Sequence, residues 1–370
     1  MASLRAPAGG PLVGLRIVEF AGIGPAPFAC MLLSDMGADV VTIDRPGSRK
    51  GDPYQIVNRG RTVVQADLKT RAGIEEVLTL LDHADVLVEG FRPGVMERLG
   101  LSPEAVGQRN PRLVYARMTG WGQDGPLAKA AGHDINYIAI TGAMHAIGTP
   151  ETPLPPLNLV GDYGGGSLYL VTGILAALLE TRSSGRGQVV DAAISDGVIS
   201  LMTHFVSSSL RGTFKEQRSS NMLDGGAPYY RAYKTADGEH VSVGPIEPQF
   251  FAEFCARLEV PTELRGAQND PAQWPVLSKE LEAIFRTRTQ AEWRERLEST
   301  DACFAPVLRL SDAMRHPHNL ARHAFVDIEG VRQPAPAPRF SRTPSAVQGP
   351  PAGTVSAHRE VIARWARDAV

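Results

Sequence analysis

A strand–helix–strand pattern near the N-terminus constrains the fold more than any other feature of this sequence. Residues 15–20 (Leu-Arg-Ile-Val-Glu-Phe) predict a strand, residues 25–36 an apolar helix and residues 39–43 a second strand. The alternation continues through predicted elements over residues 62–65 (strand), 70–83 (helix), 85–88 (strand) and 112–117 (strand). Parallel neighbours need a crossover connection, usually a helix, so this order predicts an α/β fold with a parallel sheet flanked by helices.

The second half of the chain has a different character. A helix rich in Leu and Ala is predicted over residues 165–180, a short strand over 188–191 and a long helical stretch from about 193 to 210. Turn-rich sequence then leads into short strands and amphipathic helices, which predict a smaller α+β domain. Residues 331–351 are rich in proline, and residues 355–369 predict a terminal helix.

These patterns predict two domains of unequal size. The predicted parts are a large domain over residues 1–200, completed by 330–370; a linker over 201–224; a small domain over 225–320; and a return linker with the C-terminal segment over 321–370.

Composition and charge exclude several classes of protein. Lys+Arg 38 against Asp+Glu 40 gives a formal net charge of -2, which argues against a nucleic-acid binder held by a general basic field. Cys30, Cys255 and Cys303 fit neither a disulfide framework nor a zinc-ligand spacing, which favours a reducing compartment. The N-terminus lacks an apolar core of signal-peptide length, and no later run reaches the length of a membrane helix. We therefore predict a soluble, cytoplasmic protein with no nucleic-acid or membrane partner.

The loop over residues 22–27 raises the question of a nicotinamide cofactor. Gly22-Ile-Gly24-Pro25-Ala-Pro27 follows a predicted strand and opens a helix, and Asp44 lies about twenty residues on, as in a dinucleotide-binding fingerprint. The match is incomplete, because Pro27 replaces the third glycine and Pro25 removes a backbone N–H near the expected phosphate cradle. The sequence favours a close-packed turn between strand and helix.

Four basic residues form a further candidate group: Arg45, Lys69, Arg92 and Arg98. Three of them, Arg45, Lys69 and Arg92, lie directly after predicted strands or at the start of a predicted helix. Open α/β sheets bind ligands beyond the carboxyl ends of their strands, so this spacing suits a phosphorylated ligand. Solvated surface charges explain the same spacing equally well.

Two further segments are candidates for acid–base chemistry. His133 lies beside Asp134 in an otherwise apolar loop or helix start, although a lone histidine of this kind is usually structural. Asp162 precedes a run of three glycines at the predicted start of an apolar helix, where a plain helix cap explains the aspartate. Three glycines exceed what a cap needs, and free N–H groups at a helix start can also receive an anionic oxygen.

At these residues the chain resembles the family III CoA-transferase fold, and within it the α-methylacyl-CoA racemases. The resemblance covers nearly the whole chain. It is most specific in five stretches, over residues 116–123, 131–137, 158–162, 187–191 and 221–230.

The resemblance implies a fold, an assembly and a site. The implied fold is a Rossmann-like large domain with a smaller α+β domain, and the implied assembly is an intertwined homodimer with its active site at the subunit interface. His133 and Asp162 match the two catalytic bases, Glu247 matches the carboxylate that supports the histidine, and Asn158 matches a residue beside the aspartate. The implied CoA contacts are Arg45, Ala66, Asp67, Leu68, Lys69, Gly90, Phe91, Arg92, Arg98, Gly132, Asp134 and Tyr137.

The activity implied is the interconversion of (2R)- and (2S)-2-methylacyl-CoA thioesters by removal and return of the α-proton through an enolate, with one base on each face. No metal or separate cofactor is expected, because CoA is part of the substrate. We expect N–H groups at the glycine-rich helix start after Asp162 to receive the enolate oxygen. The turn over residues 22–27 is then a family feature and not a nicotinamide site.

Two other interpretations stay open. A CoA-transferase of the same fold would use Asp162 as a nucleophile that forms a mixed anhydride with the acyl group. Residues 221–230 resemble the racemase version, and His133 supplies a second base that such a nucleophile does not need. A CoA-binding protein without catalysis is disfavoured, because all three proposed catalytic residues are in place.

Overall fold

The computed structural model describes residues 9–48 and 51–367. Its internal contacts divide the chain into two compact units. The first comprises Met1–Gly142, Pro156–Met202 and His323–Val370, and the second comprises Ala143–Pro155 and Thr203–Arg322.

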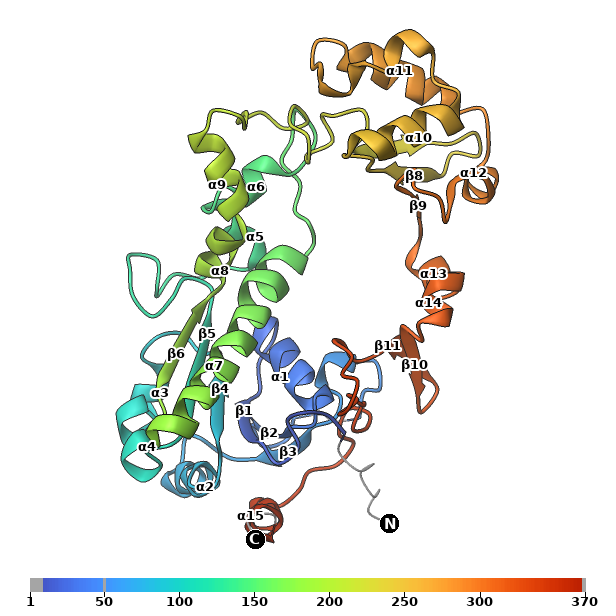
Figure 1. Ribbon diagram of the computed structural model, residues 1–370. Coiled ribbons are helices and arrows are strands. Elements are labelled where there is room, and N and C mark those ends of the chain that lie inside the picture. The colour runs from blue at the N-terminus through green and yellow to red at the C-terminus, as the bar shows by residue number, and fades with distance from the viewer. Residues whose placement is uncertain (1–8, 49–50, 368–370) are drawn as a thin grey trace. The chain divides into compact units, whose positions relative to one another are not determined.

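The first unit is built on a six-stranded sheet whose strands all run parallel, in the order β3-β2-β1-β4-β5-β6 (Figure 1). This is the strand order of the Rossmann fold. The predicted parallel sheet is confirmed, and each predicted strand overlaps an observed one. The strands are β1 (Arg16–Phe20), β2 (Asp39–Asp44), β3 (Thr62–Gln65), β4 (Val86–Glu89), β5 (Val114–Thr119) and β6 (Val189–Ala193).

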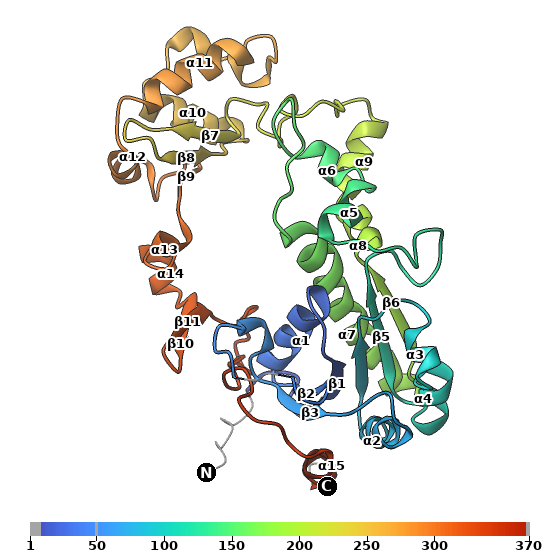
Figure 2. The same cartoon turned by 180° about the vertical axis from the view of Figure 1, so that it is seen from behind.

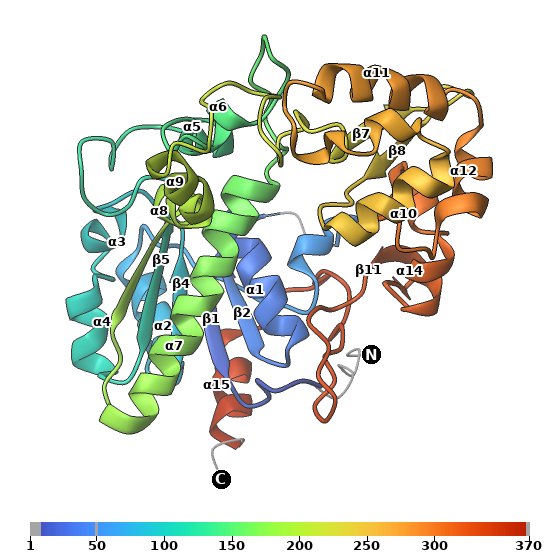
Figure 3. The same cartoon turned by 45° about the horizontal axis from the view of Figure 1, so that its top comes forward.

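Helices cover both faces of this sheet. Helices α1 (Pro25–Asp35) and α7 (Leu168–Ser184) pack together on one face, and α2 (Arg71–Leu81), α4 (Pro103–Arg109) and α15 (His358–Arg367) lie on the other (Figure 3). The Thr70 hydroxyl accepts a hydrogen bond from the Gly73 N–H and so caps the start of α2. Shorter elements of this unit are η1 (Ile56–Asn58), α3 (Val95–Arg98), α5 (Asp134–Ala139), η2 (Leu159–Ser167) and α8 (Ile194–Leu201).

Two predicted helices differ from the observed ones. The stretch predicted as one helix over residues 193–210 is two helices, α8 and α9 (Thr203–Leu210). They separate at Met202, whose N–H bonds to both Val198 and Ile199 and tightens the last turn of α8. The helix predicted over 165–180 starts earlier, because the nine-residue π-helix η2 runs directly into α7.

The continuous helix over η2 and α7, Leu159–Ser184, contains an 18-residue window with a mean hydropathy of 1.3, and by length and composition it could cross a membrane. The prediction that no run reaches such a length is therefore wrong. In this structure α7 packs on β5 and β6, and its Leu170 and Ile174 are fully buried in the first unit. Core helices of globular proteins pass the same test, so the run alone does not indicate a membrane span.

The second unit has its own sheet and core (Figure 2). Its antiparallel strands are β7 (Arg231–Lys234), β8 (His240–Val243) and β9 (Phe304–Val307), in the order β7-β8-β9. Phe254, Phe285 and Trp293 are buried where its helices pack on this sheet. The helices are α6 (Ala143–Ala146), α9, α10 (Pro248–Leu258), η3 (Thr262–Leu264), η4 (Ala267–Asn269), α11 (Trp274–Phe285), α12 (Gln290–Leu297), α13 (Leu310–Ala313) and α14 (Pro317–Ala321).

The segment over residues 143–155 belongs to the second unit, whereas the sequence analysis placed it in the large domain. The guanidinium of Arg218 explains the difference. It donates to the carbonyl oxygens of His145, Thr149 and Pro150, at 2.9, 2.7 and 3.2 Å. These bonds tie the segment to residues that the sequence analysis assigned to a linker.

The C-terminal segment packs on the first unit, beginning with the hairpin of β10 (Phe325–Ile328) and β11 (Val331–Pro334). Gln333 Oε1 and the Pro334 carbonyl accept hydrogen bonds from Arg59 Nη1, at 2.9 and 2.8 Å. Arg59 also forms an ion pair with Asp35, and both side chains are almost fully buried. The tail therefore completes the hydrogen bonding of a charge in the interior.

Further along, Gln348 Nε2 donates to the carbonyls of Ser34 and Ala38. In α15, Arg364 and Trp365 Nε1 both donate to the Asp39 carboxylate. The terminal helix was predicted over 355–369, of which residues 368–369 lie outside the described part of the chain.

Candidate active site

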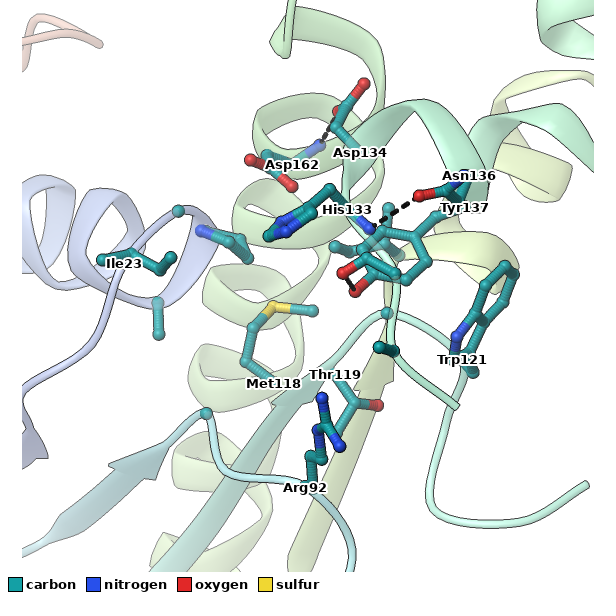
Figure 4. Close-up of a pocket in the computed structure, with 18 of the residues that line it drawn as sticks. Ile23, Arg92, Met118, Thr119, Trp121, His133, Asp134, Asn136, Tyr137 and Asp162 are labelled. Carbon is teal, nitrogen blue, oxygen red and sulfur yellow. Dashed lines mark hydrogen bonds between the residues drawn. The ribbon is translucent and has the colours of Figure 1, made fainter. Parts of the chain in front are cut away.

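A cavity of about 640 Å³ opens at the carboxyl ends of the central strands of the first unit. Its walls come from the loops after β1, β4 and β5, from residues 128–133, from α5 and from η2. This is where open α/β sheets bind ligands. Figure 4 shows part of this lining, including Ile23, Arg92, Met118, His133 and Asp162.

His133 immediately precedes α5 and is held by its own backbone. Its N–H donates to Asn136 Oδ1 at 3.1 Å, and its carbonyl accepts from the N–H groups of Asn136 and Tyr137. These bonds cap the helix and fix the residue in an extended conformation. The imidazole is left exposed on the cavity side.

Asp162 lies on η2, with its carboxylate beside the His133 ring on the side of the cavity toward Ile23 (Figure 4). Its N–H donates to Asp134 Oδ1 at 2.7 Å, and the Gly161 N–H also bonds to the Asp134 carboxylate. Asn158 Nδ2 lies 3.5 Å from Asp162 Oδ2, the outer limit of a hydrogen bond. The two proposed bases are therefore neighbours, and Asp134 anchors the backbone of one of them.

The local electrostatics make Asp162 a stronger proton acceptor than an ordinary aspartate. Loss of hydration and the nearby Asp134 charge raise the pKa of Asp162, while Asn158 and His133 oppose the rise. Burial also raises the pKa of Asp134, against the N–H bonds from Asp162 and Gly161. Two carboxyl groups with raised pKa in one cavity are typical of a site that handles protons.

The glycine run after Asp162 serves packing. A Cβ on Gly165 would lie 2.5 Å from Val198 Cγ2 and 2.9 Å from the Ile194 carbonyl, so η2 and α8 can pack this closely only with glycine there. The helix also begins at Leu159, before Asp162, so the glycines lie inside it. The predicted helix start after Asp162 is wrong, and the N–H groups of Gly161 and Asp162 in its first turn are taken by Asp134.

The turn over residues 22–27 is also a close-packing feature. Gly24 has φ 75°, and a Cβ there would lie 3.3 Å from Asp162 Oδ2. The Pro25 carbonyl accepts a hydrogen bond from the Ser167 hydroxyl at 2.7 Å. The turn is therefore close-packed, as the strand-to-helix interpretation expected, and it brings the start of α1 against η2 beside Asp162.

An aromatic corner forms the opposite wall. Trp121 and Tyr137 meet edge to face with their ring centroids 4.7 Å apart, and the Tyr137 hydroxyl donates to the Gly132 carbonyl. Burial and the Asp162 charge raise the pKa of Tyr137. Trp121 had no predicted role, although it lies in residues 116–123, one of the stretches that carried the family resemblance.

The structure brings eight of the predicted site residues together at this cavity: His133, Asp162, Gly90, Phe91, Arg92, Gly132, Asp134 and Tyr137. Asn158 lies outside the lining but contacts Asp162. Glu247 belongs to the second unit, where it is exposed at the start of α10.

The remaining predicted CoA contacts are Arg45, Ala66, Asp67, Leu68, Lys69 and Arg98, and none of them lines the cavity. Arg45 follows β2 and residues 66–69 follow β3, and both strands are parallel to β1. These residues therefore lie at the same edge of the sheet as the cavity, but their role stays a prediction.

Sequence reasoning missed several lining residues, chiefly small or apolar ones that carry no chemical signal: Ile23, Ala26, Met118, Ala128, Ala130, Ala131 and Ile194. The alanine-rich run just before His133 could have drawn attention to three of them, Ala128, Ala130 and Ala131.

Comparison with known proteins gives consistent results. The model of CoA-transferase family III matches residues 12–358. The chain is 45% identical over 356 residues to an alpha-methylacyl-CoA racemase of Mus musculus, covering 94% of this chain and 93% of that protein. It is 41% identical over 338 residues to the alpha-methylacyl-CoA racemase of Homo sapiens, covering 90% and 87%. Among solved structures, a CAIB/BAIF family protein from Brucella suis matches with a TM-score of 0.83 and 25% identity, covering 96% of this chain and 100% of that one.

Proposed function

The chain belongs to CoA-transferase family III, and from that membership we propose that it is an α-methylacyl-CoA racemase that interconverts (2R)- and (2S)-2-methylacyl-CoA thioesters. The observation that carries the proposal is the 41–45% identity to racemases over nine-tenths of the chain. The cavity supports it, because His133 and Asp162 lie beside one another there.

The chemistry needs two bases, because the proton removed from one face of the α-carbon must be replaced on the other. In one direction the Asp162 carboxylate takes the α-proton, and the C–H electron pair passes into a thioester enolate. A protonated His133 then delivers its proton to the opposite face. In the other direction the two residues exchange roles, and each contributes about 10²–10⁴-fold to the rate.

Further parts of the proposal rest on the family resemblance. They are a homodimer with its site at the subunit interface, Glu247 as the carboxylate that supports the charged form of His133, and CoA contacts at the edge of the sheet around Arg45, Lys69, Arg92 and Arg98. A cytoplasmic location also stays a prediction.

Deuterium incorporation tests the proposal directly. The purified protein is incubated with (2R)-2-methylacyl-CoA in D₂O, and configuration and α-deuterium are followed by chiral chromatography and mass spectrometry. We expect both epimers to appear carrying deuterium without any added carboxylic acid. If nothing happens until a carboxylic acid is supplied and CoA then moves to it, Asp162 acts as a nucleophile and the protein is a transferase.

The raised pKa of Asp162 predicts a specific pH dependence. In the direction where Asp162 is the base, kcat/KM should fall as the pH drops through that pKa, which lies above the ordinary aspartate value of 3.8. Asp134→Asn keeps an oxygen for the Asp162 N–H but removes the charge that helps to raise the pKa. The acid limb should therefore move to lower pH in this variant. An acid limb that stays in place or moves to higher pH would show that the Asp134 charge does not act on Asp162.

A further inference from the structure

A chain of three charged side chains lies directly beneath the cavity loop that follows β4. We define the Glu–Arg–Glu chain as Glu89 at the end of β4, Arg117 on β5 and Glu97 on α3. Glu89 and Arg117 are opposite one another on neighbouring parallel strands. Arg117 Nε lies 2.9 Å from Glu89 Oε1, and its Nη1 lies 2.9 Å from Glu97 Oε1.

Glu89 is fully buried, and the Arg117 side chain is only 8% exposed. Burial raises the pKa of Glu89, against the Phe91 N–H and the Arg117 guanidinium. Burying charges is costly, and an ion pair in the interior seldom stabilises a fold more than apolar side chains of the same size would. The racemase chemistry uses none of these three residues, so their placement calls for another explanation.

The hydrogen bonds of the Glu–Arg–Glu chain show that it contacts the segment after β4. The second oxygen of Glu89, Oε2, accepts the Phe91 N–H at 2.7 Å. Phe91 belongs to the segment Gly90–Pro93 that lines the cavity. At the other end, Glu97 lies on α3, whose start is bonded back to this segment through the Val95 N–H and the Arg92 carbonyl. The Glu–Arg–Glu chain therefore contacts residues 90–98 near both ends, at Phe91 and at Glu97.

We propose that Glu89, Arg117 and Glu97 are positioning residues that hold residues 90–98 in the conformation that receives the CoA part of the substrate. The inference rests on the proposed function, because the substrate class comes from it. The segment contains four of the predicted CoA contacts, namely Gly90, Phe91, Arg92 and Arg98. A loop fixed before binding loses less conformational freedom when the ligand arrives. The Glu–Arg–Glu chain should therefore increase the affinity for coenzyme A and have little effect on kcat.

Glu89→Gln is the decisive variant. Glutamine replaces one of the two carboxylate oxygens with an NH₂ group, which donates, so Phe91 N–H and Arg117 Nε no longer each face an oxygen as they do with Glu89. Arg117 keeps its pair with Glu97, which preserves a partner for the buried charge. We expect the affinity for coenzyme A, measured by isothermal titration calorimetry, to fall by about tenfold or more. KM for the acyl-CoA should rise in parallel while kcat stays near the wild-type value.

Glu19→Gln is a matched control. Glu19 is also a buried strand glutamate paired to an arginine, with Arg61 Nε 3.1 Å from its Oε2, and none of its hydrogen bonds reaches the cavity loop. The affinity of the Glu19→Gln variant for coenzyme A should differ from that of the wild type by less than about twofold. If Glu89→Gln fails to fold, Glu97→Gln replaces it, because Glu97 is 38% exposed and lies at the outer end of the chain. It should weaken coenzyme A binding in the same sense.

Three results would overturn the inference. The first is unchanged coenzyme A affinity in a folded Glu89→Gln or Glu97→Gln variant, the second is an equal loss of affinity in Glu19→Gln, and the third is a fall in kcat with KM unchanged. Binding is measured without turnover, so the test is separate from that of the proposed function. A wild-type protein that binds coenzyme A but exchanges no α-proton contradicts the racemase proposal alone.

Discussion

Asp162→Asn is expected to lower the rate of racemisation by about 10²–10⁴-fold, because asparagine cannot take a proton from the α-carbon. The variant keeps the size of the side chain and the N–H bond to Asp134, so η2 should retain its shape. The rate is measured as α-deuterium incorporation at saturating substrate. A variant with more than a tenth of the wild-type rate would remove Asp162 from the reaction.

Stability distinguishes this loss from unfolding. The pKa of Asp162 is raised in the folded protein, so its contribution to stability is greatest at low pH and is lost as the pH rises through that pKa. At neutral pH the ionised carboxylate therefore costs stability, and Asp162→Asn should unfold at a temperature at or above that of the wild type. His133→Gln should show a rate loss of the same order, about 10²–10⁴-fold. Wild-type activity in either variant would contradict the two-base mechanism.

Asp35→Ala is expected to destabilise the protein by about 3–5 kcal/mol, because it leaves the Arg59 guanidinium without its carboxylate in the interior. The side chains of Arg59 and Asp35 are 1% and 2% exposed, and Arg59 Nη2 lies 2.5 Å from Asp35 Oδ2. Urea unfolding, followed by circular dichroism, measures the change.

Asp82→Ala is the matched control for this prediction. Asp82 forms an ion pair of the same length with Arg109, but the two side chains are 30% and 33% exposed. Water screens such a pair, so its loss should cost no more than about 1 kcal/mol. Equal destabilisation by the two variants would mean that burial does not determine the strength of the Arg59–Asp35 pair.

The sheet was predictable from the sequence because its strands are short apolar runs separated by helix signals. Val40, Val41 and Val86 are fully buried. Strands of a parallel sheet are covered on both faces, so short apolar runs of this kind predict them. The break at Met202 and the π-helix before α7 were not predictable. In each of these two segments the apolar residues have the pattern of one continuous α-helix. The break and the π-helix arise from backbone hydrogen bonds, which the composition does not specify.

The site was predictable to a smaller extent. His133 and Asp162 stood out as polar groups in apolar surroundings, but their pairing came from the family resemblance, because one precedes α5 and the other lies on η2, far apart along the chain. The role of Asp134 as the anchor of the Asp162 backbone depends on the fold alone. Met118 and Ile194 in the cavity wall carry no chemical signature, so their position in space identifies them as lining residues.

The C-terminal segment also sets the order in which the first unit can be completed during synthesis. Gln333 lies 274 residues after Arg59, its hydrogen-bond partner. A ribosome adding about 5–20 residues per second reaches Gln333 roughly 14–55 s after Arg59. Throughout that interval the guanidinium has Asp35 but lacks its two acceptors from the tail, and the sheet face on which α15 packs lacks that helix. The first unit therefore cannot form all of its native contacts until the C-terminal segment has been synthesised.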